Sequence, residues 1–195
     1  SVVASTGSMS FGEFSAVLNQ VKTDGFNALR NDTLLSDNDG YDNDSYQLSY
    51  TTPEWDGWSA TLSAREVEAA ADYDSCGRFD ENFSFISSND CSDGYKNATQ
   101  GMIVRHRGTG YSTQLSISES ESDRAYYTDG IFQFALEGSN EQASLTHNRT
   151  LTESMDITVG IDLDEQSYDN GFGTARSRDN DGMFINIRRA GDTAT

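Results

Sequence analysis

Apolar and polar residues alternate along most of this chain, with the period of two that is typical of β-strands. The alternation is clearest in residues 46–51, 58–64, 114–118 and 157–164. Helix-type spacing of apolar residues is nearly absent. We therefore predict an all-β chain whose strands have one apolar and one very polar face, as in a soluble sandwich with one wet face or in a membrane barrel.

Eight strands are predicted from this alternation and from the turn residues between the alternating segments. They lie near residues 9–23, 45–52, 58–67, 99–107, 111–120, 130–149, 156–165 and 182–189. The short links are 53–57, 108–110 and 150–155, and the long links are 24–44, 68–98, 121–129 and 166–181. Short turns that alternate with long polar loops are typical of an antiparallel up-and-down outer-membrane barrel, whereas a Greek-key sandwich has no reason to keep this order.

Segment 130–149 fits this order only under one interpretation. Residues 132–136 and 143–147 each alternate like a strand, and Gly138-Ser139-Asn140 between them has the composition of a turn. A turn there would break the alternation of short and long links. We therefore interpret the segment as one long strand with a bulge.

The charge balance excludes some classes of partner. The chain has 13 Lys and Arg against 32 Asp and Glu, a formal net charge of −19, which argues against binding nucleic acid or anionic headgroups by charge. Its 10 Phe, 9 Tyr and 2 Trp, together with the clear alternation, argue against disorder. No apolar run approaches the roughly 18 residues of a membrane helix.

The chain reads as a piece of a longer protein. Its 195 residues are enough for one domain, but no basic segment followed by an apolar one opens it, so no signal peptide is visible. Eight open strands would leave two unpaired edges, which cannot exist in lipid. We expect residues 1–195 to be part of one barrel domain that is stable only with its missing strands.

Two cysteines, Cys76 and Cys91, enclose a polar loop rich in Gly, Ser and Asn. Two cysteines around one loop and none elsewhere favour a disulfide formed in an oxidising compartment over two free thiols in the cytosol. Closing a loop of this length is worth about 3 kcal/mol in the chain-entropy account. Neither cysteine has a nearby histidine, which argues against a zinc site.

Segment 36–44, Ser-Asp-Asn-Asp-Gly-Tyr-Asp-Asn-Asp, is the densest group of oxygen ligands in the chain. So many carboxylates and carboxamides in one turn are unfavourable without a counter-charge, and calcium takes six to eight such oxygens in a flexible loop. The spacing is not that of an EF-hand. The local sequence leaves two interpretations open, a calcium site and a solvated acidic loop.

Several segments resemble one known family when they are taken in order. They are Thr23–Asn27, Asp37–Tyr41, Leu48–Leu62 and Ala71–Ser75, followed more weakly by Val104–His106 and Ile157–Asp164. In this order and spacing the chain resembles the early barrel of TonB-dependent outer-membrane receptors, most of all the vitamin B12 (cobalamin) receptors. The N-terminal plug, its energy-coupling box and the C-terminal strands of that family have no counterpart in these residues.

The resemblance implies a partial transmembrane β-barrel, about 8 strands of a 22-strand barrel, in the bacterial outer membrane. It implies TonB-energised uptake of a scarce nutrient, with cobalamin the leading substrate and an iron siderophore second. The TonB complex would act through the absent plug, and the barrel would contact outer-membrane lipid.

The resemblance also implies that two extracellular loops bind calcium together and that the ion orders them for the substrate. The positions that carry the family's ligands over to this chain are Asn27, Asp37, Asp39, Tyr73, Asp74 and Asp90. The alignment is loose at the last position, where Asp93 is the other choice. The family has an aspartate where this chain has Asn27, and the lost charge is expected to weaken calcium binding, with Asp24 the nearest substitute.

Two other classes of protein remain open from the residues alone. A passive outer-membrane porin would need neither plug nor calcium, and a secreted calcium-stabilised β-sandwich adhesin would fold alone in water. Enzyme activity is not expected, because the only histidines, His106 and His147, lie within polar strand segments and no serine occupies a nucleophile elbow.

Overall fold

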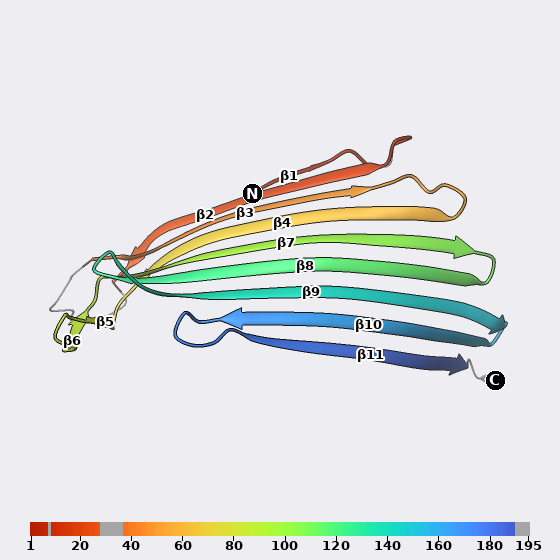
Figure 1. The fold of residues 1–195 in the computed structure, drawn as a ribbon. Coiled ribbons are helices and arrows are strands. Elements are labelled where there is room, and N and C mark those ends of the chain that lie inside the picture. The colour runs from red at the N-terminus through yellow and green to blue at the C-terminus, as the bar shows by residue number, and fades with distance from the viewer. Residues whose placement is uncertain (8, 28–36, 190–195) are drawn as a thin grey trace, which may run out of the picture.

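The computed structural model describes residues 1–7, 9–27 and 37–189, and these residues form an all-β fold (Figure 1). One sheet has nine antiparallel strands and a second has two. The large sheet contains β1 (Val2–Ser5), β2 (Glu13–Phe26), β3 (Asp39–Thr51), β4 (Trp58–Tyr73), β7 (Cys91–Gly108), β8 (Tyr111–Thr128), β9 (Ile131–Thr152), β10 (Met155–Asp169) and β11 (Arg176–Arg189). The small sheet is a hairpin of β5 (Cys76–Phe79) and β6 (Phe85–Ser88). The described residues include no helix that could cross a membrane.

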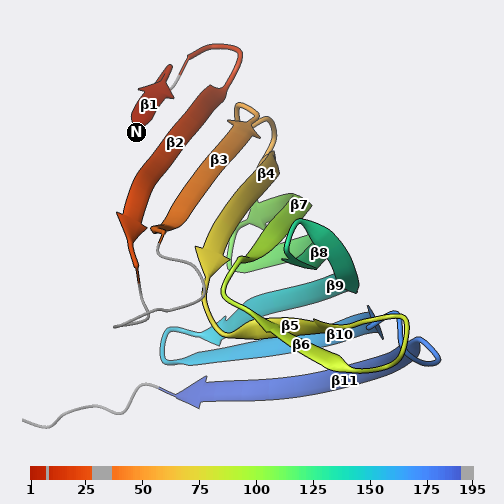
Figure 2. The ribbon, with the colours of Figure 1, turned by 90° about the vertical axis from the view of Figure 1, so that its left-hand side faces the viewer.

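The large sheet is a meander, in which each strand pairs with the next along the chain and only the β5–β6 hairpin is inserted, between β4 and β7. Viewed along the strands, the sheet curls into an arc (Figure 2). Its two outer strands are β1 and β11, which are not neighbours in the sheet. Within the described residues the sheet is therefore open, with a free edge on each side.

One face of the sheet is apolar across its whole width, because cross-strand partners share a face. Leu62, Met102, Ile117, Ala143 and Leu163 pair in one unbroken row from β4 to β10. Leu62 is 50% exposed and Leu163 48%, so no second layer covers this row. We call this surface, which also carries the row Ala60, Val104, Leu115, Leu145, Ile161 and Met183, the apolar face.

The opposite face carries small polar side chains and glycines. Ser63, Gly101, Ser118, Gln142 and Asp164 pair in the row beside the one just described. Hydrogen bonds join neighbours on this polar face; the Gln142 side-chain amide, for example, donates to Asp164 Oδ2 at 2.8 Å. The polar face therefore satisfies its own groups in part, while the apolar face has no partner.

The structure confirms one long strand in segment 130–149, where β9 begins at Ile131, but it places the bulge elsewhere. Tyr126 pairs with Phe134 and Tyr127 with Phe132, so the extra residue is Gln133. The register is continuous through Gly138. Residues 138–140 have the composition of a turn but stay extended, because backbone hydrogen bonds to β8 and β10 on both sides hold them in the sheet.

The predicted long links are wrong in length, and one of them is wrong in kind. Residues 121–128, predicted as part of a long link, belong to β8, and only Asp129 and Gly130 form the tight turn that leads into β9. In addition, strand β1 was not predicted. The strands extend further than expected, so that β2 ends at Phe26 and β3 begins at Asp39, and the other two long links shrink to 74–90 and 170–175. Residues 121–128 have the polar composition of a loop, but they pair with neighbouring strands on both sides.

Gly57, in the turn between β3 and β4, has a backbone φ of +78°. An added Cβ would overlap the Arg107 carbonyl oxygen. We expect Gly57→Ala to lower the free energy of unfolding by more than about 1 kcal/mol, because alanine is strained at this positive φ and its Cβ would overlap the Arg107 carbonyl oxygen. Gly94→Ala is the matched control, since a Cβ added at Gly94 would have no atom within 4 Å. Thermal unfolding followed by circular dichroism measures both, and equal midpoints would contradict the steric explanation.

Candidate functional site at the loop end of the sheet

All the expected calcium ligands lie at one end of the sheet. We call this end, where β2 ends, β3 begins and links 74–90, 129–130 and 170–175 lie, the loop end, and the opposite end the turn end (Figure 1). At the loop end, the ends of four neighbouring strands, β2, β3, β4 and β7, bring together segments that are far apart in the sequence. The expected ligands at these strand ends are Asn27, Asp37, Asp39, Tyr73, Asp74 and Asp90.

The ligands share an edge of the sheet, but the described residues do not surround one point with them. Asp39 pairs with Phe26, and Tyr73 with Cys91, so the ligand positions follow one another across strands. Within the described ranges, no group of three or more His, Cys, Asp or Glu side chains is arranged to hold a metal ion. Asp39 and Asp74 each interact within the fold, and Asp37 is exposed.

The chemistry of this set suits a hard cation. Its donors are carboxylate, carboxamide and phenol oxygens, which calcium prefers and which exclude a soft-metal site. Asn27 Oδ1 is buried and has no hydrogen-bond partner among the described residues. A buried carbonyl oxygen is costly without a partner, and a bound cation would supply one. The Asn27 amide oxygen is therefore available as a ligand.

Asp93, the other choice for the last ligand, already has a partner. Its side chain is only 9% exposed and accepts a hydrogen bond from Arg124 Nε at 2.6 Å. This ion pair favours Asp90 over Asp93 as the loop ligand.

The disulfide between Cys76 and Cys91 is present, as predicted, with Cα atoms 6.0 Å apart. It joins the first residue of β5 to the first residue of β7 and so closes the base of the β5–β6 hairpin. Thr128, 2% exposed, packs against this base and donates a hydrogen bond to the Gly77 carbonyl oxygen at 3.4 Å. Figure 2 shows the hairpin projecting across the loop end of the sheet.

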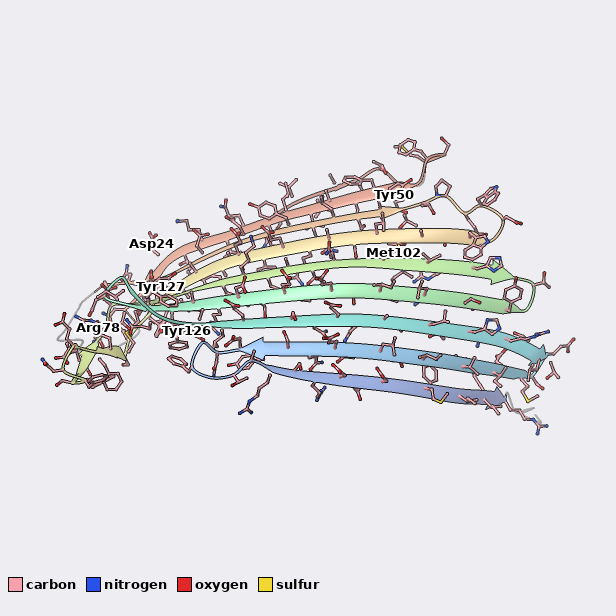
Figure 3. The ribbon with its side chains drawn as sticks, in the orientation of Figure 1. Asp24, Tyr50, Arg78, Met102, Tyr126 and Tyr127 are labelled. Atoms are coloured by element: carbon pink, nitrogen blue, oxygen red, sulfur yellow. A yellow bond between two sulfur atoms is a disulfide. The ribbon has the colours of Figure 1, made fainter. Side chains whose placement is uncertain are left out.

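A second fastening holds the hairpin to the β8–β9 turn. Ser88 Oγ donates to Asp129 Oδ1 at 2.6 Å, and Arg78 Nε donates to Asp129 Oδ2 at 3.1 Å. Arg78 is labelled at this end in Figure 3. Sequence reasoning missed Asp129 because its segment was assigned to a long loop. The Asp-Gly pair was the available signal, since both residues adopt the positive φ of a tight hairpin turn.

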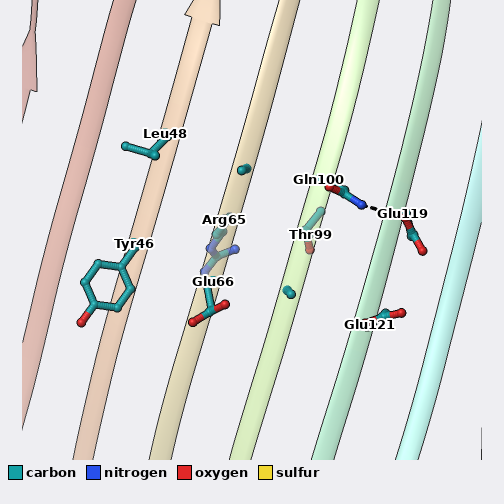
Figure 4. A pocket seen from close by; sticks show the side chains of 10 residues that line it. Tyr46, Leu48, Arg65, Glu66, Thr99, Gln100, Glu119 and Glu121 are labelled. Atoms are coloured by element: carbon teal, nitrogen blue, oxygen red, sulfur yellow. Dashed lines mark hydrogen bonds between the residues drawn. The ribbon is translucent and has the colours of Figure 1, made fainter.

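The apolar face stops abruptly on the way to the loop end. The next row on that face is Gln100, Glu119, Glu141, Glu165 and Asp179, paired strand by strand. The Gln100 amide donates to Glu119 at 2.8 Å, beside a shallow hollow of about 440 Å³ near Tyr46 and Leu48 (Figure 4). This carboxylate row therefore marks the limit of the apolar surface on the side of the loop end.

Comparison with known proteins adds no family to this description. No protein-family model matches the chain, and no curated protein matches it.

The hydrogen bond from Ser88, and then the ion pair with Arg78, lower the pKa of Asp129. Because the pKa of Asp129 is lowered in the folded protein, its carboxylate stabilises the docked hairpin fully above the ordinary aspartate pKa of about 3.9. This stabilisation is lost as the pH falls through the lowered pKa of Asp129. We expect the Asp129 carboxyl to titrate below that value by NMR. Ser88→Ala should move the titration midpoint upward, and an unchanged midpoint would remove Ser88 as its cause.

Proposed function

We propose that this chain is part of the β-barrel of an outer-membrane receptor, with its apolar face against lipid and its polar face toward the interior. The observation that carries the proposal is the uncovered apolar face, continuous from strand to strand, opposite a face of small polar residues. A soluble sandwich needs a second sheet on such a face. The described residues supply only the two-stranded β5–β6 hairpin, which lies at the loop end.

The length of the apolar stretch supports a membrane position. On β10 the alternate residues from Met155 to Leu163 are all apolar, a stretch of nine residues. A transmembrane β-strand tilted by about 45° needs about 9–11 residues. The carboxylate row then limits the apolar face toward the loop end.

Aromatic rings limit the apolar face toward the turn end. The Trp58 and His106 rings stack at 4.3 Å, and the Tyr111 ring meets His106 edge-on at 5.5 Å. Amphipathic rings of this kind gather at the headgroup level of membranes. The turn end would face the periplasm and the loop end the outside.

The free edges at β1 and β11 require further strands, because unpaired backbone groups are too costly in lipid. The resemblance to TonB-dependent receptors supplies a specific form of closure, a barrel of about 22 strands. In this form the protein takes up a scarce, large nutrient, with cobalamin favoured and an iron siderophore second. The energy comes from the TonB complex acting through a plug.

Calcium has a defined part in this proposal. The ion would be held by Asn27, Asp37 and Asp39 from one loop and by Tyr73, Asp74 and Asp90 from the next. It would neutralise carboxylates that otherwise repel each other, and so hold the two loops at fixed positions for the substrate. The chain's own residues position these oxygens through the ends of β2, β3, β4 and β7.

The lipid-facing assignment is tested by two neighbouring residues on β9. Leu145 lies on the apolar face and Ser144 on the polar face. We expect Leu145→Arg to reduce insertion of the whole protein into lipid vesicles, at a cost of about 2–4 kcal/mol, and Ser144→Arg to have little effect. Equal insertion of both variants, or a loss only with Ser144→Arg, would refute the orientation.

Cyanocobalamin binding to the whole protein in detergent, measured by calorimetry with calcium or with chelator, tests the receptor and its ion. We expect binding that weakens when calcium is removed and in Asp39→Asn. Asp56→Asn, at the turn end, is the matched control and should behave like the unchanged protein. Binding that ignores chelator would remove the calcium role. Absence of binding would exclude cobalamin and leave a siderophore receptor or a porin.

A further inference from the structure

A second group of side chains at the loop end lies on the polar face, apart from the six expected calcium ligands. It surrounds an open hollow of about 280 Å³. The hollow is lined by Tyr41 of β3, Ala69 and Ala71 of β4, Asp93 and Tyr95 of β7, and Arg124 of β8. No local pattern groups these residues, which come from four strands.

The register of the strands explains the shape of the hollow. Tyr41, Ala71 and Asp93 pair in one row, and Ala69 and Tyr95 pair in the next. The two alanines leave a low floor on β4, and the tyrosines stand diagonally across it, Tyr41 on β3 and Tyr95 on β7. Strands two apart lie about 10 Å from each other, and a ring packs about 3.5–4 Å from its neighbour. The floor therefore has room for one ring, which can contact either tyrosine.

The ion pair at the side of the hollow is held firmly from behind. Arg124 Nε binds Asp93 at 2.6 Å, and the guanidinium carbon lies 5.1 Å from the centre of the Tyr126 ring. Tyr126 in turn stacks on Phe134 at 4.5 Å. Asp93 is 9% exposed but the Arg124 side chain is 48% exposed, so the guanidinium presents its outer edge to a ligand while its position is fixed.

We propose that this hollow binds one ring of a neutral, polyhydroxylated ligand, a sugar unit of an oligosaccharide. The C–H faces of a sugar ring pack on phenol rings, and neighbouring hydroxyl groups accept hydrogen bonds from the exposed edge of the Arg124 guanidinium. Two parallel donors on one planar group give both affinity and orientation. The location outside the cell rests on the proposed function; the binding chemistry rests on the hollow alone.

Other ligand classes fit the hollow less well. Asp93 already balances Arg124, and the chain carries a net charge of −19, so an anion gains little and is repelled at long range. A cation would compete with Arg124 for a carboxylate that is already engaged. A wholly apolar ring would cover the ion pair without replacing its lost water contacts, which is costly.

The test is calorimetric titration of the whole protein in detergent with four probes: maltohexaose, cellohexaose, laminarihexaose and xylohexaose. We expect at least one of them to bind. Tyr41→Ala and Tyr95→Ala should each weaken binding about tenfold, equivalent to about 1.4 kcal/mol. Arg124→Lys keeps the positive charge beside Asp93 but loses the planar pair of donors, and we expect a loss of similar size.

Tyr168→Ala is the matched control, because Tyr168 lies on the polar face near the loop end of β10 and is 47% exposed. It should bind like the unchanged protein. Failure of all four sugars to bind would overturn the proposal, as would binding that the three hollow variants leave unchanged or that Tyr168→Ala weakens equally. Cyanocobalamin binding is measured separately, so that loss of the receptor function and loss of the sugar site are distinguishable.

Discussion

The backbone ladder between neighbouring strands is the interaction on which the rest of this structure depends. The apolar face has no hydrophobic core beneath it; Cys91 is the only buried apolar residue among those described. Hydrogen bonds from strand to strand therefore fix the register within the sheet, and the register alone decides which side chains become neighbours. A slip of one residue in any strand would place serines and glutamines on the apolar face and leucines among the polar side chains.

The period of two was enough to predict an all-β, antiparallel chain, because alternation survives wherever a strand separates two different environments. It predicted the apolar segments of β4, β8 and β10 correctly. It failed at the polar ends of strands, where segments such as 121–128 have the composition of a loop but still pair on both sides. Side-chain composition indicates whether a segment prefers a loop or a strand. The hydrogen-bond ladder between strands requires only backbone groups and a neighbouring strand, so a polar segment can also pair.

The candidate sites show the same division. Asn27, Asp39 and Asp74 could be found from local density of oxygen ligands and from the resemblance, since they lie close to one another along the chain or near strand ends. The hollow around Asp93 and Arg124 could not be found in this way, because the two residues lie 31 positions apart. Their pairing depends on the register of β7 with β8, which no local pattern specifies. The Ser88–Asp129 contact was missed because residues 121–129 were assigned to a long loop and not to the end of a strand and a tight turn.

The disulfide at the base of the β5–β6 hairpin determines what happens to the molecule when a protease cleaves this hairpin. Exposed loops are the preferred points of attack for proteases, and the hairpin tip, with Phe83 88% exposed, is such a point. A single cut between Cys76 and Cys91 would leave the two fragments joined by the bond between the sulfur atoms. Each fragment also keeps its own long strand of the sheet next to the disulfide, β4 in one and β7 in the other. A nicked molecule would keep all of its parts in place, and the damage would be visible only after reduction.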